Sequence, residues 1–246
     1  MADKVNNIGR LFYKDYYKEV DWVQYNNLNK GEDLKIDATI KDSPLVEIKK
    51  PVEGIDSICA TVLYPGLVTG VGLSHDAKVG YKLGMHFDYT HGMPIVYGSS
   101  VKGVLKTYFK DFFLAKYPNA NEKTDAEPLV EMIFEGKKPN KNGNVPLYER
   151  DVFFDAVIVK SNDKGKILED DYITPHPDPL KNPTPIKMLK IASGCTMEFR
   201  FRLCDTVVGG MKFSVADKLE LFKDILTTVG IGAKTNVGYG QLKIVE

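Results

Sequence analysis

The sequence predicts an α+β protein whose core elements follow one another in the order strand, helix, strand, strand, helix, strand. Two observations lead to this order. Two segments carry apolar residues at helical spacing, and four others have the composition or the alternation of strands. The pattern is that of a ferredoxin-like (RRM-like) βαββαβ core, here with large insertions and an N-terminal helical extension. RNA-recognition modules share this pattern, but a fold by itself does not define a function.

We expect residues 1–54 to form the N-terminal helical extension and a linker. Apolar residues recur at roughly helical spacing within residues 1–30, whereas residues 31–51 are polar and indicate a linker or an irregular arm. Residues 55–246 then form a single domain. Its insertions are expected at about 66–97, 119–150 and 161–194.

The first half of this domain contains one strand and one helix of the core. The strand covers residues 55–63, which are β-rich and followed by Pro65-Gly66. The helix is expected to begin at Ser99 or Ser100, either of which can cap it, and to end at Pro118. Its apolar face is formed by Val101, Val104, Leu105, Tyr108, Phe109 and Phe112.

The second half supplies the remaining core elements. Strands are expected over residues 151–160, 195–203 and 241–245. A helix over residues 214–229 begins with Ser214 and Asp217, which resemble a capping box. We expect a short helix near residues 129–134, and an irregular chain over residues 161–190 because prolines gather there.

Composition restricts the classes of function. The chain has 33 Lys and Arg against 33 Asp and Glu, so any polyanion must bind a local basic patch rather than a global positive field. Three separated cysteines, Cys59, Cys195 and Cys204, indicate neither a disulfide framework nor a zinc site. The N-terminus lacks the apolar segment of a signal peptide, and no apolar run is long enough to span a membrane. We therefore expect a cytoplasmic protein that needs no cofactor.

The first candidate binding motif is residues 98–103 (GSSVKG). Ser99 and Ser100 stand at the expected helix N-terminus, where unpaired backbone N–H groups and the helix dipole favour an anion such as phosphate. Lys102 and Lys106 lie on one helix face near that end. The alternative is an ordinary capped helix with a solvated row of lysines.

The second candidate motif is the glycine loop, residues 230–240 (GIGAKTNVGYG). The glycines Gly230, Gly232 and Gly238 allow positive φ and a close approach of the backbone to a ligand. The loop also offers polar and aromatic side chains: a charge from Lys234, hydrogen bonds from Asn236 and a stacking ring from Tyr239. Because the loop follows a helix and precedes a strand, it is not a Rossmann motif, and it is not a Walker A loop because no GKS or GKT follows at the required spacing. The alternative is a long flexible connection.

The strand over residues 195–203 adds two arginines. Its residues alternate between apolar and polar, so Arg200 and Arg202 are expected on a solvent-exposed face, where they could extend a basic patch. A solvated face without function is the alternative.

The histidines and one short motif carry weaker hypotheses. His75, His86, His91 and His176 have no strong metal-binding spacing, and none has an evident partner for acid–base catalysis. Ser99-x-x-Lys102 matches the SxxK motif of serine β-lactamases, but the other motifs of that class are missing.

The two glycine- and lysine-containing motifs together resemble those of the RAMP superfamily of CRISPR proteins. Residues 93–106 (MPIVYGSSVKGVLK) are similar to its P-x-I-x-G-S-S-x-K-G-x-x-[KR] segment, and residues 230–240 to its C-terminal glycine-rich loop. One departure is Val96-Tyr97, where the family has a small residue or proline before the glycine. A finer resemblance, to the sixth subunits of type III-B (Cmr) effectors, is carried by residues 66–72, 153–156, 171–176 and 182–186.

The resemblance implies a non-catalytic RNA-binding structural subunit of a Cmr ribonucleoprotein effector in antiviral defence. Such a subunit contacts the guide RNA near its 3′ end and the guide–target duplex, and it packs against other RAMP subunits. The implied contacts are the residues of the two motifs. Two alternatives stay open: a RAMP-type endoribonuclease that processes precursor CRISPR RNA with a histidine, and a scaffold that contacts only protein.

Overall fold

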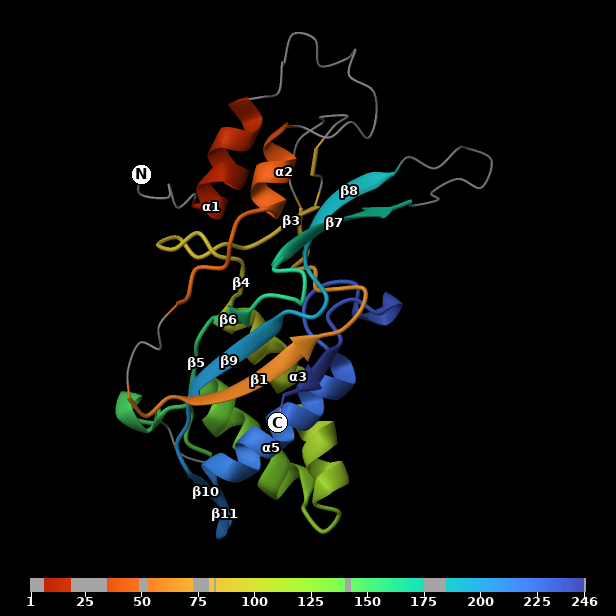
Figure 1. The fold of residues 1–246 in the computed structure, drawn as a ribbon. Coiled ribbons are helices and arrows are strands. Elements are labelled where there is room, and N and C mark those ends of the chain that lie inside the picture. The colour runs from red at the N-terminus through yellow and green to blue at the C-terminus, as the bar shows by residue number, and fades with distance from the viewer. Residues whose placement is uncertain are drawn as a thin grey trace.

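The computed structural model of the chain describes residues 7–18, 35–48, 53–72, 80–81, 83–139, 143–174 and 185–245. It confirms an α+β protein with mainly antiparallel strand pairing. One part holds the central sheet with the two long helices, and the other holds a second sheet with the N-terminal helices (Figure 1). Within the described ranges, no helix is long and apolar enough to cross a membrane.

The central sheet has the order β12-β1-β9-β6-β4, and every neighbouring pair is antiparallel. A short strand, β5, pairs with the end of β9. The predicted strands at residues 55–63, 195–203 and 241–245 are present. The six strands are β1 (Asp56–Val62), β4 (Ile95–Val96), β5 (Val152–Phe153), β6 (Ala156–Lys160), β9 (Thr196–Arg202) and β12 (Leu242–Ile244).

Two helices, α3 (Gly98–Lys116) and α5 (Val215–Val229), pack together on one face of this sheet. The ring of Phe222 on α5 lies 5.5 Å from that of Phe201 on β9, which belongs to the apolar face of its strand. The predicted capping box of Ser214 and Asp217 is confirmed at the start of α5. The burial of these apolar side chains is the main stabilising contribution to this layer.

A capping serine on α3 was a wrong prediction. Its N-cap residue is Tyr97, which makes no side-chain cap. Instead Asp155 Oδ1 accepts a hydrogen bond of 2.7 Å from Gly98 N–H. Asp155 can reach that position because the predicted strand 151–160 is interrupted between β5 and β6.

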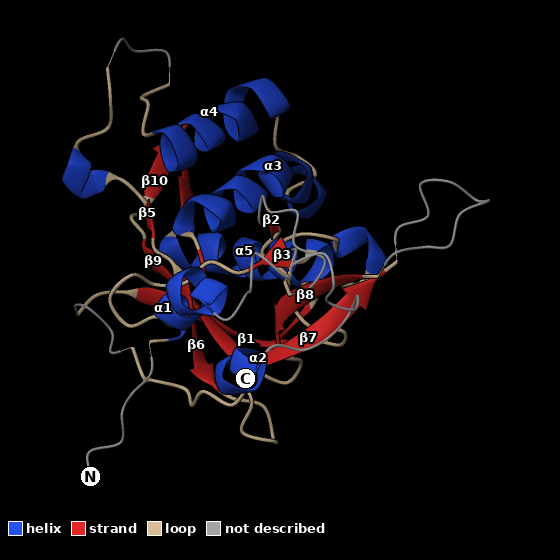
Figure 2. Cartoon of the chain, turned by 90° about the horizontal axis from the view of Figure 1, so that it is seen from above, coloured by secondary structure: helices blue, strands red, loops and turns tan. Residues whose placement is uncertain are grey.

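The insertion at residues 119–150 contains the expected short helix. It is one continuous helical segment made of η3 (Glu122–Ala126), α4 (Glu127–Val130) and η4 (Glu131–Glu135), and a 3-10 turn, η5 (Leu147–Glu149), follows. The helical segment lies against α3, where the rings of Phe109 and Phe134 meet edge to face at 5.4 Å (Figure 2).

The predicted irregular chain at residues 161–190 is wrong, because two strands there form a hairpin in the second sheet. That sheet has the order β2-β3-β8-β7. Charged residues in these two strands obscure the apolar pattern that would predict a strand. In the structure they form ion pairs with one another; Lys190 Nζ, for example, lies 2.8 Å from Asp171 Oδ2. A small hairpin after β9 was also not predicted. The elements are β2 (Val71–Gly72), β3 (Leu83–Gly84), β7 (Leu168–Ile173), β8 (Ile186–Ile191), β10 (Thr206–Val208) and β11 (Met211–Phe213).

The N-terminal extension is helical over the described residues 7–18, as α1 (Ile8–Arg10), η1 (Leu11–Asp15) and η2 (Tyr16–Lys18). The prediction of a linker or irregular arm over residues 31–51 is partly wrong, because α2 (Lys35–Lys41) lies within it. Its Asp37 is fully buried and forms an ion pair with the buried Lys187 of β8. These helices share one hydrophobic core with the rest of the described chain. The domain boundary at residue 54 stays a prediction.

Candidate nucleic-acid interface

The start of α3 differs from the open anion site that the sequence predicts. Asp155 holds the N–H of Gly98, and the N–H groups of Ser100 and Val101 point to Tyr97 O at 2.8 and 3.1 Å. Gly98 is needed here because a Cβ would lie 2.3 Å from Phe153 O. The helix dipole is therefore already complemented by a carboxylate, and a bound anion must rely mainly on side chains.

Side chains from three separate segments form a basic pocket beside this helix start. It has a volume of about 570 Å³ and is lined by Gly98, Ser99, Lys102, Leu147, Arg150, Asp151, Val152, Phe153 and Arg202. Lys102 and Arg150 are half-buried, and Arg202 is exposed. Three cations around one depression can neutralise a phosphate. Two of them are arginines, whose planar guanidinium group can bind a phosphate through two parallel hydrogen bonds.

Among the described residues that line the basic pocket, Asp151 is the carboxylate, and it is already neutralised. Asp151 Oδ2 lies 2.6 Å from Nζ of Lys218, a fully buried side chain of α5. That ammonium also donates to Cys204 O and to Thr206 Oγ1. Burial raises the pKa of the Asp151 carboxyl and lowers that of the Lys218 ammonium. Because the pair cancels its own charge, the basic pocket keeps the charges of Lys102, Arg150 and Arg202.

The lysine row on α3 is only partly available. Lys106 Nζ forms an ion pair with Glu135 at 2.9 Å, and Lys110 Nζ forms one with Glu122 at 2.7 Å. The hydrogen bonds from Lys137 and Lys106 lower the pKa of Glu135 to about 2. Of the four residues predicted at this motif, Ser99 and Lys102 line the basic pocket, whereas Ser100 and Lys106 do not.

The side chains of the two arginines of β9 lie in different environments. Arg202 is exposed and donates to Leu147 O at 3.3 Å across the basic pocket. The prediction of a solvent-exposed Arg200 is wrong, because its side chain is only 5% exposed. Arg200 forms an ion pair with Glu198 at 2.8 Å and donates to Ile48 O at 2.9 Å. The contact with the backbone of Ile48 comes from a segment distant in sequence, which the alternation within β9 cannot reveal.

The glycine loop packs against another glycine-rich segment, residues 66–72. Ala233 N donates to Val68 O at 2.7 Å, and Gly240 N donates to Gly66 O at 2.8 Å. A Cβ on Gly232 would lie 2.3 Å from Val68 O. Gly230 is similar, since its Cβ would lie 2.7 Å from Gly240 O, so these two glycines allow a close approach of the chain to itself. Gly238 has a φ of 96°, but a Cβ there would meet only Pro65 Cδ, at 3.7 Å.

Three other residues were predicted to contact a ligand from this loop. Asn236 is exposed, and Lys234 is half-buried with a φ of 62°, which is uncommon outside glycine. Tyr239, in contrast, is only 8% exposed, and its hydroxyl donates to Asp171 Oδ2 at 2.8 Å. Burial, with the Asp171 carboxylate, raises the pKa of Tyr239 to about 12. The prediction of a stacking Tyr239 is therefore wrong for the structure described, since its ring is enclosed by Val68 and Met188.

The basic pocket and the glycine loop lie at opposite ends of the central sheet. Arg202 follows Phe201, which pairs with Asp56 at the start of β1. The glycine loop leads into Leu242, which pairs with Val62 at the end of β1. Six residue steps along a strand separate these pairs by about 20 Å. The two motifs form two sites rather than one.

One histidine lies next to the start of α3. The rings of His86 and Tyr97 stack at 4.1 Å between centroids, and burial lowers the pKa of His86. His91 is exposed and bonds to Asp88. His75 and His176 lie outside the described residues. Within the described part of the chain, no three His, Cys, Asp or Glu residues are grouped to hold a metal ion.

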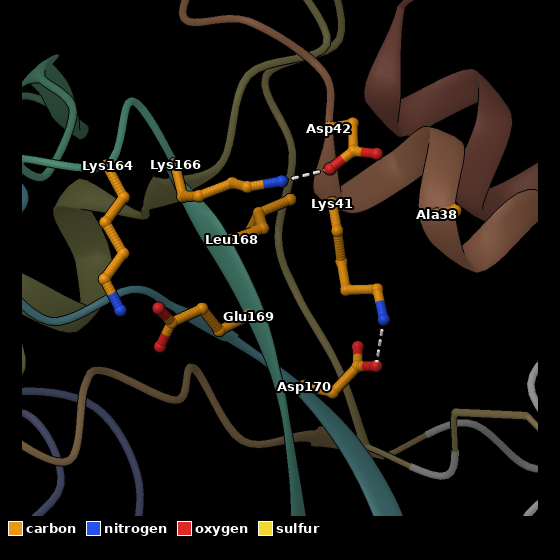
Figure 3. A pocket seen from close by; sticks show the side chains of 8 residues that line it. All are labelled: Ala38, Lys41, Asp42, Lys164, Lys166, Leu168, Glu169 and Asp170. Carbon is orange, nitrogen blue, oxygen red and sulfur yellow. Dashed lines mark hydrogen bonds and ion pairs between the residues drawn. The ribbon is translucent and has the colours of Figure 1, made fainter.

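A further pocket between α2 and β7 carries balanced charge. Three lysines and three carboxylates line it, and Figure 3 shows two of the resulting ion pairs, Lys41 with Asp170 and Lys166 with Asp42. Because the charges cancel, this pocket is a weaker candidate for a polyanion than the basic pocket.

The fold and the two sites define an α+β protein with basic surface features at both ends of an antiparallel sheet. The family model of the RAMP superfamily matches residues 59–243. This is most of the chain, so the protein belongs to the RAMP superfamily.

One solved structure supports the same fold, and two others show a weaker likeness. A chain of a cryo-EM structure of the Type III-B Cmr-beta bound to cognate target RNA matches with a TM-score of 0.57 and 18% identity, covering 98% of this chain and 87% of that one. Cmr6 from Pyrococcus furiosus matches with a TM-score of 0.40 and 19% identity, covering 78% of this chain and 98% of that one. A chain of Cmr-beta in the apo state matches at 0.45 and 11%, with 78% and 97% covered. No curated protein matches the chain.

Sequence reasoning missed two features of this interface. Arg150 joins the basic pocket from a segment about fifty residues away from both Ser99 and Arg202, so no local spacing indicates it. The stack of His86 on Tyr97 was also missed, although Tyr97 had been noted as a departure from the family motif.

Proposed function

We propose that this chain is a non-catalytic, RNA-binding structural subunit of a type III-B CRISPR (Cmr) ribonucleoprotein effector. It contacts the guide RNA near its 3′ end and the guide–target duplex, and it packs against other RAMP subunits in the cytoplasm. Membership of the RAMP superfamily supports this, as does the likeness in fold to a chain of Cmr-beta bound to target RNA.

We further propose that the central sheet is a ferredoxin-like core. If β1, β6, β9 and β12 are its four strands, their order in the sheet is fourth, first, third, second, with all pairs antiparallel. Helix α3 lies between the first and second of these strands, and α5 lies between the third and fourth. This supports the βαββαβ pattern, with the second sheet as an insertion.

The observation that carries the proposal is the basic pocket. Lys102, Arg150 and Arg202 surround one depression, and Asp151, which also lines it, is neutralised by Lys218. Contacts of this kind bind the RNA backbone and do not depend on its sequence. The sequence is recognised instead by base pairing between guide and target. The glycine loop lies about 20 Å away, roughly six nucleotide steps along a duplex strand, so one RNA could contact both sites.

The salt dependence of RNA binding tests this role. Each cation that contacts a phosphate contributes about one to the slope of log K against log salt, slightly less for a single strand. We expect Lys102→Ala with Arg202→Ala to weaken binding of a guide-sized RNA and to lower the slope by about two. Lys110→Ala is the matched control, because Lys110 is on the same helix but paired with Glu122. Equal slopes for all three proteins would refute a phosphate site in the basic pocket.

A second candidate function, a RAMP-type endoribonuclease, is favoured by the stack of His86 on Tyr97. The pKa of His86 is lowered by burial, so its imidazole is neutral near pH 7 and could accept a proton. Incubation of a repeat-containing RNA with the purified chain distinguishes the two functions. Cleavage that is lost in His86→Ala supports the nuclease, whereas intact RNA bound by the wild-type chain supports the structural role.

A further inference from the structure

An exposed tyrosine stands beside the glycine loop. Tyr64 lies two residues beyond the end of β1, and it is 86% exposed. The backbone around it is held in place: Leu63 N donates to Gln241 O, and Gly66 N donates to Leu63 O, both at 2.9 Å. A ring in water on a well-anchored backbone loses little conformational freedom when it binds a partner.

The glycine loop packs against the segment that carries this ring, since Gly240 N donates to Gly66 O at 2.8 Å. Pro65, the residue after Tyr64, lies against Gly238 of the loop: a Cβ added to Gly238 would lie 3.7 Å from Pro65 Cδ. Lys234 precedes the 3-10 turn Thr235–Val237, and Asn236 is exposed within it. Among the described residues, no carboxylate forms an ion pair with Lys234. The segment of Tyr64 and the glycine loop packed on it therefore offer an aromatic ring, a positive charge and an amide.

This combination fits an unpaired nucleotide. A base can stack on a tyrosine ring whatever its identity, while a lysine binds the phosphate and an amide bonds to the base or ribose. In a duplex the base faces are already stacked, so the ring favours a single strand. A protein partner is a poorer fit, since interface cores are depleted of lysine.

We propose that Tyr64 stacks on a base of single-stranded RNA, with Lys234 and Asn236 contacting the same nucleotide. This inference rests on the proposed RNA-binding function and adds a second contact point at the opposite end of the sheet from the basic pocket. It replaces Tyr239, whose ring is buried, as the stacking residue of the glycine loop.

The test uses the full chain and single-stranded RNA that contains the fluorescent base 2-aminopurine, at low salt. We expect Tyr64→Phe, which keeps the ring, to bind within about twofold of the wild type. Tyr64→Leu, which keeps an apolar side chain but no ring, should bind about tenfold more weakly and lose the quenching caused by stacking. Tyr89→Leu is the matched control, because Tyr89 is fully exposed on a distant turn.

The outcomes separate this inference from the function on which it rests. RNA binding that depends on Lys102 and Arg202 but is unchanged in Tyr64→Leu overturns the inference and leaves the proposed function standing. An absence of RNA binding by every protein, including the wild type, contradicts both. Normal RNA binding by Tyr64→Leu with failed co-purification of other RAMP subunits would identify a protein contact and also overturn the inference.

Discussion

At the residue scale, the glycine loop shows how one residue type can serve two purposes. Gly240 has a φ of 71°, and a Cβ there would lie 1.8 Å from Ile231 O. Gly54 has a similar φ of 81°, but a Cβ there would meet no atom within 4 Å. The first glycine is required by conformation and by space, and the second by conformation alone.

This difference predicts the stability of two alanine variants. Gly54→Ala should cost about 1–2 kcal/mol, the strain of a left-handed non-glycine residue. Gly240→Ala should cost more than about 3 kcal/mol, because backbone must also move. Urea unfolding of both variants measures the costs. Equal losses of unfolding free energy in the two variants would mean that the glycine loop can shift to make room for the new Cβ. Its close packing would then contribute little to stability.

Tyr239 is the second informative residue, because its hydroxyl ties the glycine loop to β7 through Asp171. We expect Tyr239→Phe to lower the free energy of unfolding by about 1–3 kcal/mol at neutral pH. The pKa of Tyr239 is raised to about 12 in the folded chain, so the protonated form is favoured by folding. Its contribution is complete below pH 10 and is lost as the pH rises towards 12.

Unfolding of the wild type and of Tyr239→Phe at pH 7, 9 and 11 measures this contribution. The difference between the two proteins should be constant up to about pH 9 and should shrink at pH 11. Because the Tyr239 ring is buried away from any RNA, RNA affinity should change little. A difference that grows with pH would contradict the assigned hydrogen bond.

At the element scale, α3 depends on a residue that is distant in sequence. Asp155 accepts the hydrogen bond of Gly98 N–H at the helix start, and the adjacent Ser99 lines the basic pocket. A carboxylate there stabilises the helix through its dipole but opposes an incoming phosphate. Helix stability and RNA affinity therefore compete at this position.

The variant Asp155→Asn separates these two effects. The amide keeps a hydrogen-bond acceptor, so the loss of stability should stay within about 1 kcal/mol. RNA affinity should rise by a few fold at low salt, because one negative charge near the basic pocket is removed. Asp163→Asn, on an exposed turn, is the control for net charge. Weaker RNA binding by Asp155→Asn would mean that the carboxylate itself positions the RNA site.

At the scale of the whole molecule, the N-terminal helices are part of the main core. The ring of Phe12 lies 5.7 Å from that of Tyr81 and 5.4 Å from that of Phe87. The buried pair of Asp37 and Lys187 ties α2 to the second sheet. An extension attached in this way should unfold together with the domain rather than separately.

The substitution Phe12→Ala tests this coupling. We expect a loss of about 3–5 kcal/mol with a single unfolding transition. Hydrogen exchange should then accelerate by a similar factor in η1 and in β9. Tyr89→Ala, at a fully exposed position, should change neither quantity. Faster exchange in η1 alone would show that the extension opens independently.

Much of the fold could be predicted because its strongest signals are local. The apolar faces of α3 and α5, the capping box at Ser214 and the alternation of β9 depend only on residues near one another in sequence. The second sheet could not be predicted in this way. Strands β7 and β8 carry charged residues that become acceptable only when Asp171 meets Lys190 and Asp37 meets Lys187.

The same distinction between local signals and distant contacts applies to the candidate sites. The sequence by itself predicted the two long helices, the main strands and the position of both motifs, and it proposed Ser99, Lys102, Arg202, Lys234 and Asn236 as RNA contacts, since each prediction depends on residue type and local spacing. Only the tertiary structure decided which of these side chains share a surface. It buried Arg200 and Tyr239, brought Arg150 into the basic pocket and left Tyr64 exposed. Burial and pairing depend on segments that are distant in sequence, and no local pattern encodes those contacts.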